Sequence, residues 1–124
     1  MAGVSEAQDQ EIVISWSLYY DCLKWLHHVP NGAFLHGNQQ QRARQMIKLK
    51  KQGVKVGVLD LFLPAARHGY HGLYIEMKRR DGKGRLSPEQ KEFSADISEA
   101  GYLCVTCNGA DEAIAEIKNY MELK

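Results

Sequence analysis

The sequence has no long apolar run, and its 124 residues include only three cysteines and three prolines. A helix that crosses a membrane needs about 20 consecutive apolar residues, so neither a membrane span nor a membrane partner is predicted. The opening MAGVSEAQDQE turns acidic where a secretory signal would be basic and then apolar. We therefore expect a cytoplasmic protein.

The few cysteines also exclude a disulfide scaffold, because an odd number without an export signal is typical of reduced thiols. Cys104 and Cys107 have the spacing of half a zinc knuckle. On a strand, however, residues three apart point to opposite faces, and no second Cys or His pair completes a tetrahedral site. We interpret the cysteines as reduced, packed thiols.

Positive charge is concentrated in the middle of the chain, although the formal net charge is only +1. Residues 22–91 contain fourteen Lys or Arg and four acids, whereas residues 1–21 hold four acids and no base. Residues 92–124 hold seven acids and two bases. A basic middle attracts a polyanion, most plausibly nucleic acid, but charge alone favours a solvated helix surface equally.

Hydropathy patterns predict one α/β domain over residues 1–124 with a small mixed sheet flanked by helices. A broad apolar stripe predicts one long helix from Glu6 to about His28, with a break near Tyr20 left open. The further predicted elements, in chain order, are a basic helix at 39–53, antiparallel strands at 54–64 and 72–80, a helix at 86–101, a strand at 102–107 and a helix at 108–121.

Two neighbouring strands carry charge on one face. In LYIEMKRR, residues 73–80, alternation puts Glu76 and Lys78 on one face and three apolar residues on the other. In the preceding strand the leucines point to one face and Asp60 points to the other face. Burying unpaired carboxylates is costly, so a divalent cation or Lys78 should neutralise them. A simple salt bridge explains any single pair, but two acids and a lysine in one hairpin form a larger cluster.

Metal-assisted phosphodiester hydrolysis is the chemistry that uses such a cluster. Mg²⁺ prefers carboxylate and water oxygens, holds the scissile phosphate and lowers the pKa of a bound water. A lysine alongside orients that water or stabilises charge on the phosphoryl oxygens. Gly57, just before Asp60, is predicted to let the backbone approach a ligand closely.

The segments GVLDLFLP, GLYIEMKRRDGKGRLSPEQKEF and AGYLCVTCNGADEAIAEIKNY resemble the VRR-NUC family, the virus-type replication-repair nucleases of the PD-(D/E)xK superfamily. The opening SEAQDQEIVISW and the HHVPNG segment resemble the family's usual start. The resemblance implies a restriction-endonuclease-like core. One departure is Leu59, because a proline often precedes the motif aspartate in the family.

The resemblance implies a site that uses Mg²⁺ or Mn²⁺ and no small-molecule cofactor. Asp60 and Glu76 are the implied catalytic metal ligands, and the main-chain carbonyl of Met77 completes part of the metal shell. Lys78 is the implied catalytic lysine, and Gln90 is the implied glutamine of the following helix. These roles follow from the family's motif.

Two of the implied roles have structural alternatives. The segment Ser87-Pro-Glu-Gln90 is also a capping box, in which the glutamine bonds back to the amide of the N-cap residue. Glu6, four residues before Gln10, is the implied first-helix metal ligand, with Glu11 as the fallback. An acid at Glu6 equally fits a solvated first helical turn, where the helix dipole favours it.

The implied substrate is structured DNA, and stand-alone members of the family resemble dimeric Holliday junction resolvases. We therefore expect branched DNA as a partner and a homodimer, with the aromatic residues of the N-terminal helix as its suspected surface. DNA phosphates should contact a set of basic residues and make binding strongly salt-dependent. These residues are Arg42, Arg44, Lys48, Lys50, Lys51, Lys55, Arg67, Arg79, Arg80, Lys83 and Arg85.

Two other functions are alternatives to a stand-alone endonuclease. One is a non-catalytic nucleic-acid-binding module, whose acids Lys78 neutralises. The other is a nuclease subunit of a larger restriction or repair complex, which shares the chemistry. The complete set of two acids and a lysine favours the enzyme, because a module without catalysis has no reason to keep mutually costly charges.

Overall fold

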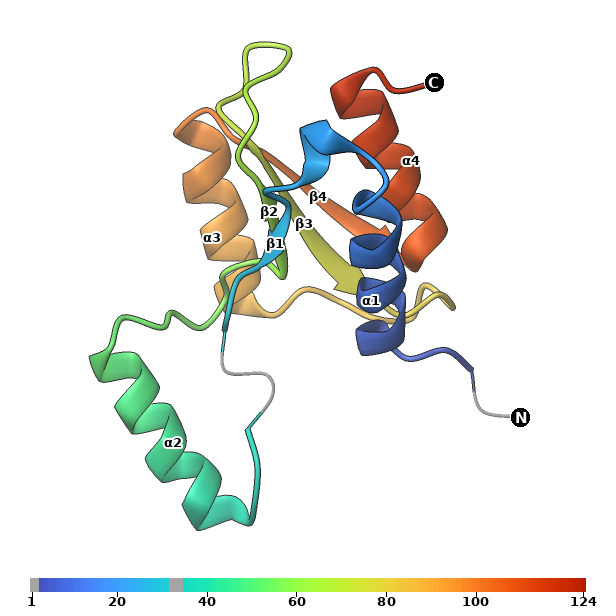
Figure 1. Ribbon diagram of the computed structural model, residues 1–124. Coiled ribbons are helices and arrows are strands. Elements are labelled where there is room, and N and C mark those ends of the chain that lie inside the picture. Colours follow the sequence, from blue (N-terminus) through green and yellow to red (C-terminus); the bar gives the residue numbers. More distant parts are fainter. Residues whose placement is uncertain (1–2, 32–34) are drawn as a thin grey trace.

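A mixed sheet of four short strands lies between helices in the computed structural model, which describes residues 3–31 and 35–124 (Figure 1). The strand order is β1-β2-β3-β4, antiparallel except for the parallel pair β3–β4. The elements are α1 (Glu6–Ser17), the 3-10 helix η1 (Asp21–Leu23), β1 (His27–His28), α2 (Gln39–Lys51), β2 (Leu61–Leu63), β3 (Leu73–Lys78), α3 (Pro88–Glu99), β4 (Leu103–Asn108) and α4 (Ala110–Met121). The predicted α/β fold with a small mixed sheet is confirmed.

The core lies between one face of the sheet and helices α1 and α4, while α3 covers the opposite face (Figure 1). Alternate residues of β2 and β3 are fully buried, as period-two alternation predicts. They pack with Val13 of α1 and with Ala113 and Ile117 of α4. The outward face of the strands is therefore the one that meets α3.

The predicted helix from Glu6 does not run unbroken to His28, and the break near Tyr20 that was left open is confirmed. Helix α1 ends at Ser17, whose buried hydroxyl donates to the Ile14 carbonyl at 2.6 Å, a bond that competes with continued helix. Tyr20 then takes an extended backbone. The chain turns because Leu23 and Leu26 are buried in the core, which a straight helix could not achieve. The segment after them becomes the edge strand β1.

Helix α2 projects from the rest of the fold in Figure 1. All thirteen of its residues are described, and none is buried. Its N-terminus has a capping box between Asn38 and Gln41. The predicted basic helix is confirmed.

The three cysteines are free thiols, as predicted, but Cys22 is exposed and not packed. Cys107 is buried, and burial together with Glu116 and Glu112 raises the pKa of its thiol to about 12. In the part of the chain that the structure describes, no helix has the length and apolarity to cross a membrane.

Candidate active site

Asp60 and Glu76 come together because β2 and β3 pair antiparallel. Leu61 is opposite Ile75 in the register, so Asp60, directly before β2, lies next to Glu76. Leu61 and Ile75 point into the core, which directs both carboxylates to the face covered by α3. The predicted parity of the two strands is confirmed.

The Asp60 carboxylate is held by both of its oxygens. Its Oδ2 accepts a hydrogen bond from the Met77 amide at 2.8 Å, and its Oδ1 accepts from Asn31 Nδ2 at 3.4 Å. In a strand, the N–H and C=O of one residue point to the same side. The Met77 carbonyl therefore faces the Asp60 segment, where the resemblance places a metal ligand.

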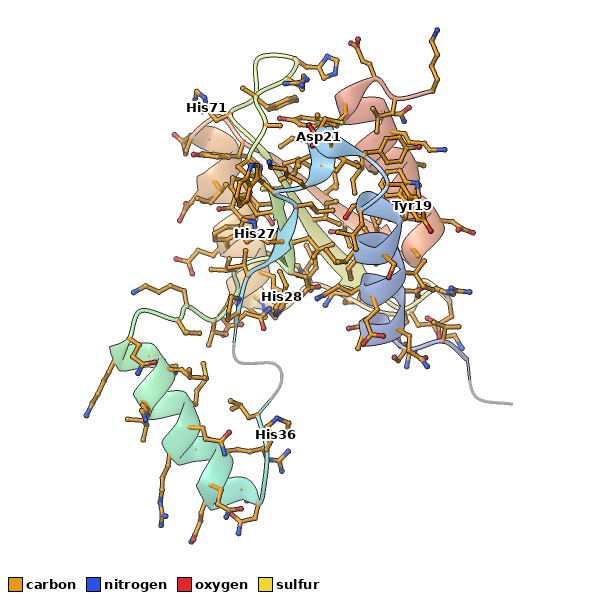
Figure 2. All side chains as sticks on the ribbon, viewed as in Figure 1. Tyr19, Asp21, His27, His28, His36 and His71 are labelled. Carbon is orange, nitrogen blue, oxygen red and sulfur yellow. The ribbon has the colours of Figure 1, made fainter. Side chains whose placement is uncertain are left out.

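Asn31 is a site residue that the sequence analysis missed. Its Nδ2 donates to the Val58 carbonyl at 3.3 Å as well as to Asp60. Figure 2 shows His28 on the neighbouring strand β1, where its Nδ1 lies 2.9 Å from the Asp60 carbonyl oxygen. The HHVPNG segment, which resembles the family's start, was the available signal, but it gave no role for the asparagine.

Glu76 is only 3% exposed and has two differently placed oxygens. Oε2 accepts from Gln90 Nε2 at 2.7 Å and lies 3.3 Å from Lys78 Nζ. Oε1 is buried and has no hydrogen-bond partner among the described residues. Burial and then the negative charge of Asp60 raise the pKa of Glu76 to about 7, although Lys78 opposes the shift.

Lys78 reaches this site from the end of β3. Its Nζ donates to Gln90 Oε1 at 3.3 Å and pairs with Glu76 at the same distance. The side chain lies against Gly84 in the loop after β3: a Cβ on Gly84 would lie only 3.2 Å from the Lys78 Cδ. Gly84 thus leaves just enough room for the lysine stem.

Gln90 has both of the contacts that the sequence left as alternatives. It closes the capping box at the start of α3, because its Oε1 accepts from the Ser87 amide at 2.9 Å. Its Nε2 donates to Glu76. Capping therefore orients the amide: because the Gln90 oxygen is fixed at the cap, its nitrogen points at the Glu76 carboxylate.

Gly57 approaches the backbone of α3 closely, and its approach to a ligand stays a prediction. Its φ is 98°, and a Cβ at this position would lie 2.6 Å from the backbone carbonyl carbon and oxygen of Glu89. The close approach is thus to the first turn of α3. This contact ties the segment that carries Asp60 to the helix that carries Gln90.

Asp9 and Arg80 form a second charged pair that the sequence analysis missed. Asp9 of α1 is fully buried, and it accepts from Arg80 Nε at 2.9 and 3.1 Å and from Nη2 at 2.7 Å. Arg80 lies two residues beyond Lys78, at the end of β3. The pair therefore fixes α1 against the strand that carries Glu76 and Lys78.

A family model for the VRR-NUC domain matches residues 5–111 of the chain. The chain belongs to the VRR-NUC family. A solved structure named "VRR_NUC domain protein" is similar to it, with a TM-score of 0.81 and 32% sequence identity over 99% of this chain and 93% of that chain. A search of curated protein sequences gave no match.

Membership of the VRR-NUC family confirms the family resemblance and the fold drawn from the motifs. It also gives the general function, because VRR-NUC is a nuclease family and a nuclease acts on nucleic acid. The matched range includes every residue of the cluster around Glu76.

Glu6 does not join the two carboxylates. Both Glu6 and its alternative Glu11 are exposed on α1. In residues 3–31 and 35–124 no three His, Cys, Asp or Glu side chains gather as a metal-ligand group. Asp60 and Glu76 therefore form a pair of acids in this structure, and a metal-binding role for Glu6 stays a prediction.

The predicted phosphate-binding residues are all exposed, in the case of Arg80 by half of its side chain. Several already have local partners. Arg79 pairs with Asp81 at 3.0 Å, and Arg85 Nη1 donates to two carbonyls of its own loop. Phosphate contacts by these residues stay predictions.

The aromatic surface suspected for dimerisation divides into two parts. Trp16 and Tyr20 pack on each other with ring centroids 5.1 Å apart and border the core. Tyr19 and Trp25 are 88% and 69% exposed. Tyr19 and Trp25 are therefore the more accessible of the four to a partner.

Proposed function

We propose that this VRR-NUC protein is a Mg²⁺- or Mn²⁺-dependent endonuclease that hydrolyses phosphodiester bonds in branched, Holliday junction-like DNA during replication, recombination or repair. The observation that supports it best is Glu76 Oε1, which is buried beside Asp60 and has no hydrogen-bond partner among the described residues. An unpartnered, buried carboxylate oxygen is costly. A cation between Glu76 and Asp60 would remove that cost.

The residues present fit such a cation. Asp60, Glu76 and the Met77 carbonyl would hold it, and these are the hard oxygen donors that Mg²⁺ and Mn²⁺ prefer. The bound ion would supply a water of lowered pKa and positive charge beside the scissile phosphate. Glu6 would be a further ligand, on the strength of the family resemblance.

Lys78 and Gln90 would act on the reacting groups beside the acids. A lysine amine has three N–H donors, and two of them serve Glu76 and Gln90. The third is left, within the described residues, for a phosphoryl oxygen or for the attacking water. Gln90 holds the Glu76 carboxylate in place through its Nε2, and the other carboxylate oxygen has no partner among the described residues.

Branched DNA and a homodimer are two further parts of the proposal. The basic residues between positions 42 and 55 are exposed and precede Asp60 in the chain. Their positive charge suits an extended polyanion. A two-fold dimer would place two sites for two symmetric cuts. A second copy of the chain would cover the exposed aromatic side chains of Tyr19 and Trp25.

A non-catalytic nucleic-acid-binding module is the second candidate. The Lys78–Glu76 pair at 3.3 Å favours it, because the lysine already neutralises part of the buried acid charge. Two acids share that single lysine, however, and this leaves one negative charge in the site at high pH. A module of this kind would bind DNA but cut none of it.

The deciding experiment compares the purified protein with its Asp60→Asn variant on labelled linear duplex, 5′ flap, replication fork and four-way junction in Mg²⁺, Mn²⁺ or EDTA. We expect metal-dependent cutting of a branched substrate that the variant loses. Asp96→Asn, which neutralises an exposed acid of α3, is the matched control and should cut normally. Binding of every DNA without cutting in either metal would favour the module.

A further inference from the structure

Helix α2 has an unusual combination of charge and position. Its thirteen residues include five Lys or Arg and no acid, and none of them is buried. A helix of this length is marginal in water without tertiary packing. Like charges four residues apart, such as Arg44 and Lys48, destabilise it further by roughly 0.2–0.5 kcal/mol per pair. The helix therefore gains little from the core and loses stability through its own charge.

Local contacts are what hold α2 together. The helix has a second local contact besides its capping box. The Gln45 side chain exchanges two hydrogen bonds with the backbone of His36, at 2.7 and 3.1 Å. The Val54 amide donates to the Leu49 carbonyl at 2.9 Å and closes the C-terminal end. Figure 2 shows His36 at the start of this projecting unit, well separated from His28 on the sheet. The chain thus builds a helix outside its core and keeps it exposed.

One side of α2 is a continuous basic stripe. Arg44, Lys48 and Lys51 follow at spacings of four and three residues, so they share a face, and all three are exposed. At about 1.5 Å rise per residue the stripe is about 10 Å long. Phosphates of a DNA strand follow at about 3.4 Å along the duplex axis, so three cations match two or three successive phosphates.

Two apolar residues of α2, Met46 and Leu49, lie on its other side, whereas the exposed Ile47 lies beside the stripe. Met46 and Leu49 are half-buried, and Leu49 accepts the bond from Val54 that closes the helix end. The chain from residue 22 to residue 59 contains seven Lys or Arg and no acid, so nothing within this segment neutralises the stripe. Charge complementarity therefore identifies the partner as a polyanion.

We propose that α2 is an arm that binds the phosphate backbone of duplex DNA outside the cleavage centre and supplies affinity without taking part in the chemistry. The proposal rests on the proposed function only in that both concern the same DNA. Lys51 precedes Asp60 by nine residues, which span at most about 30 Å when fully extended. The arm therefore contacts duplex within about ten base pairs of the cut, on a segment that flanks the branch.

The test is a triple variant, Arg44→Gln with Lys48→Gln and Lys51→Gln, because glutamine keeps helix propensity while it removes charge. The matched control is Lys24→Gln with Lys118→Gln and Lys124→Gln, three lysines outside α2 of which Lys24 and Lys124 are exposed and Lys118 is half-buried. Binding of fluorescent four-way junction and linear duplex is measured by anisotropy in EDTA from low to high NaCl. Circular dichroism and Tm check that each variant is folded.

We expect the slope of log K against log[NaCl] to fall by about two to three for the α2 variant, because each lost phosphate contact removes about 0.9. The control should keep the wild-type slope. A conservative variant, Arg44→Lys alone, should also keep it, because the charge is unchanged. Equal slopes for the folded α2 variant and the control would overturn the proposal.

Cleavage separates this proposal from the proposed function. With saturating DNA and Mg²⁺, the single-turnover rate of the α2 variant should stay within about twofold of wild type, because the arm does not touch the reacting atoms. A loss of rate at saturation with normal binding would place α2 in the chemistry and refute the arm. If wild type cuts no DNA while the α2 variant still binds with a reduced slope, the arm stands and the endonuclease fails.

Discussion

Gln90 Nε2 donates a hydrogen bond to Glu76 Oε2 at 2.7 Å, while Oε1 of the same amide accepts from the N-cap amide of Ser87 at 2.9 Å. One side chain thus both caps α3 and holds a buried acid. The two contacts depend on each other, because the cap fixes which end of the amide faces the strand. Helix α3 therefore acts as a support for the site.

Substitution of Gln90 should separate its two contacts. Gln90→Glu keeps the capping box, since glutamate is a usual N3 residue, but it replaces the donor to Glu76 with a second carboxylate. We expect a Tm close to wild type at neutral pH and a loss of cleavage of about tenfold or more, as for a lost hydrogen bond to a charged group. Gln90→Ala should lower both the Tm and the cleavage rate. Wild-type cleavage by the glutamate variant would show that Gln90 only caps.

Neutralising Glu76 should stabilise the metal-free protein at high pH. Its pKa is raised from 4.5 in the unfolded chain to about 7 in the fold. Because the folded pKa is the higher one, stability is fully retained below about pH 4.5 and is lost as the pH rises through about 7. The free energy of unfolding falls by about 3 kcal/mol at pH 8. Glu76→Gln recovers about 1–3 kcal/mol of this, and the recovery is incomplete because Lys78 loses its ion pair.

The measurement for Glu76 is Tm in EDTA from pH 5 to pH 8. The variant should melt several degrees above wild type at pH 8, and the difference should shrink toward pH 5. Mg²⁺ should raise the Tm of wild type and leave the Glu76→Gln protein almost unchanged. A variant that is less stable than wild type at pH 8 would contradict the account of the buried charge.

Gly84→Ala should disturb Lys78 without unfolding the protein. The new methyl group would lie 3.2 and 3.3 Å from the Lys78 Cδ and Cβ, so the lysine stem must move by a few tenths of an ångström. Since small misplacements of catalytic groups are expensive, we expect kcat to fall by roughly two- to tenfold with DNA affinity unchanged. Gly3→Ala, which meets no atom within 4 Å, is the control. Equal rates would show that the loop does not position the lysine.

Arg80→Ala should destabilise the fold much more than the same change at its neighbour. Removal of Arg80 leaves Asp9 fully buried without a cation, whereas removal of Arg79 frees only the exposed Asp81. We expect a fall in Tm several times larger for Arg80→Ala than for Arg79→Ala. A second change, Asp9→Asn, should restore part of the loss. Equal Tm values would mean that the pair does not fix α1 to β3.

Local sequence patterns determined much of this protein. Alternation along residues 73–78 predicted which side chains face the core, and the SPEQ segment predicted the start of α3. Both depend on residues at most four positions apart, so the chain encodes them without knowledge of the fold. The motif that contains Asp60, Glu76 and Lys78 identified the family, because it consists of residue types in a given order along the chain.

Tertiary packing alone decided the rest. The end of α1 at Ser17 follows from the burial of Leu23 and Leu26, which a local helical pattern cannot show. The contacts of Asp60 with Asn31 and of Asp9 with Arg80 join residues 29 and 71 positions apart. Such partners depend on how strands register and layers pack, because hydrogen bonding and burial act across space whatever the separation in sequence.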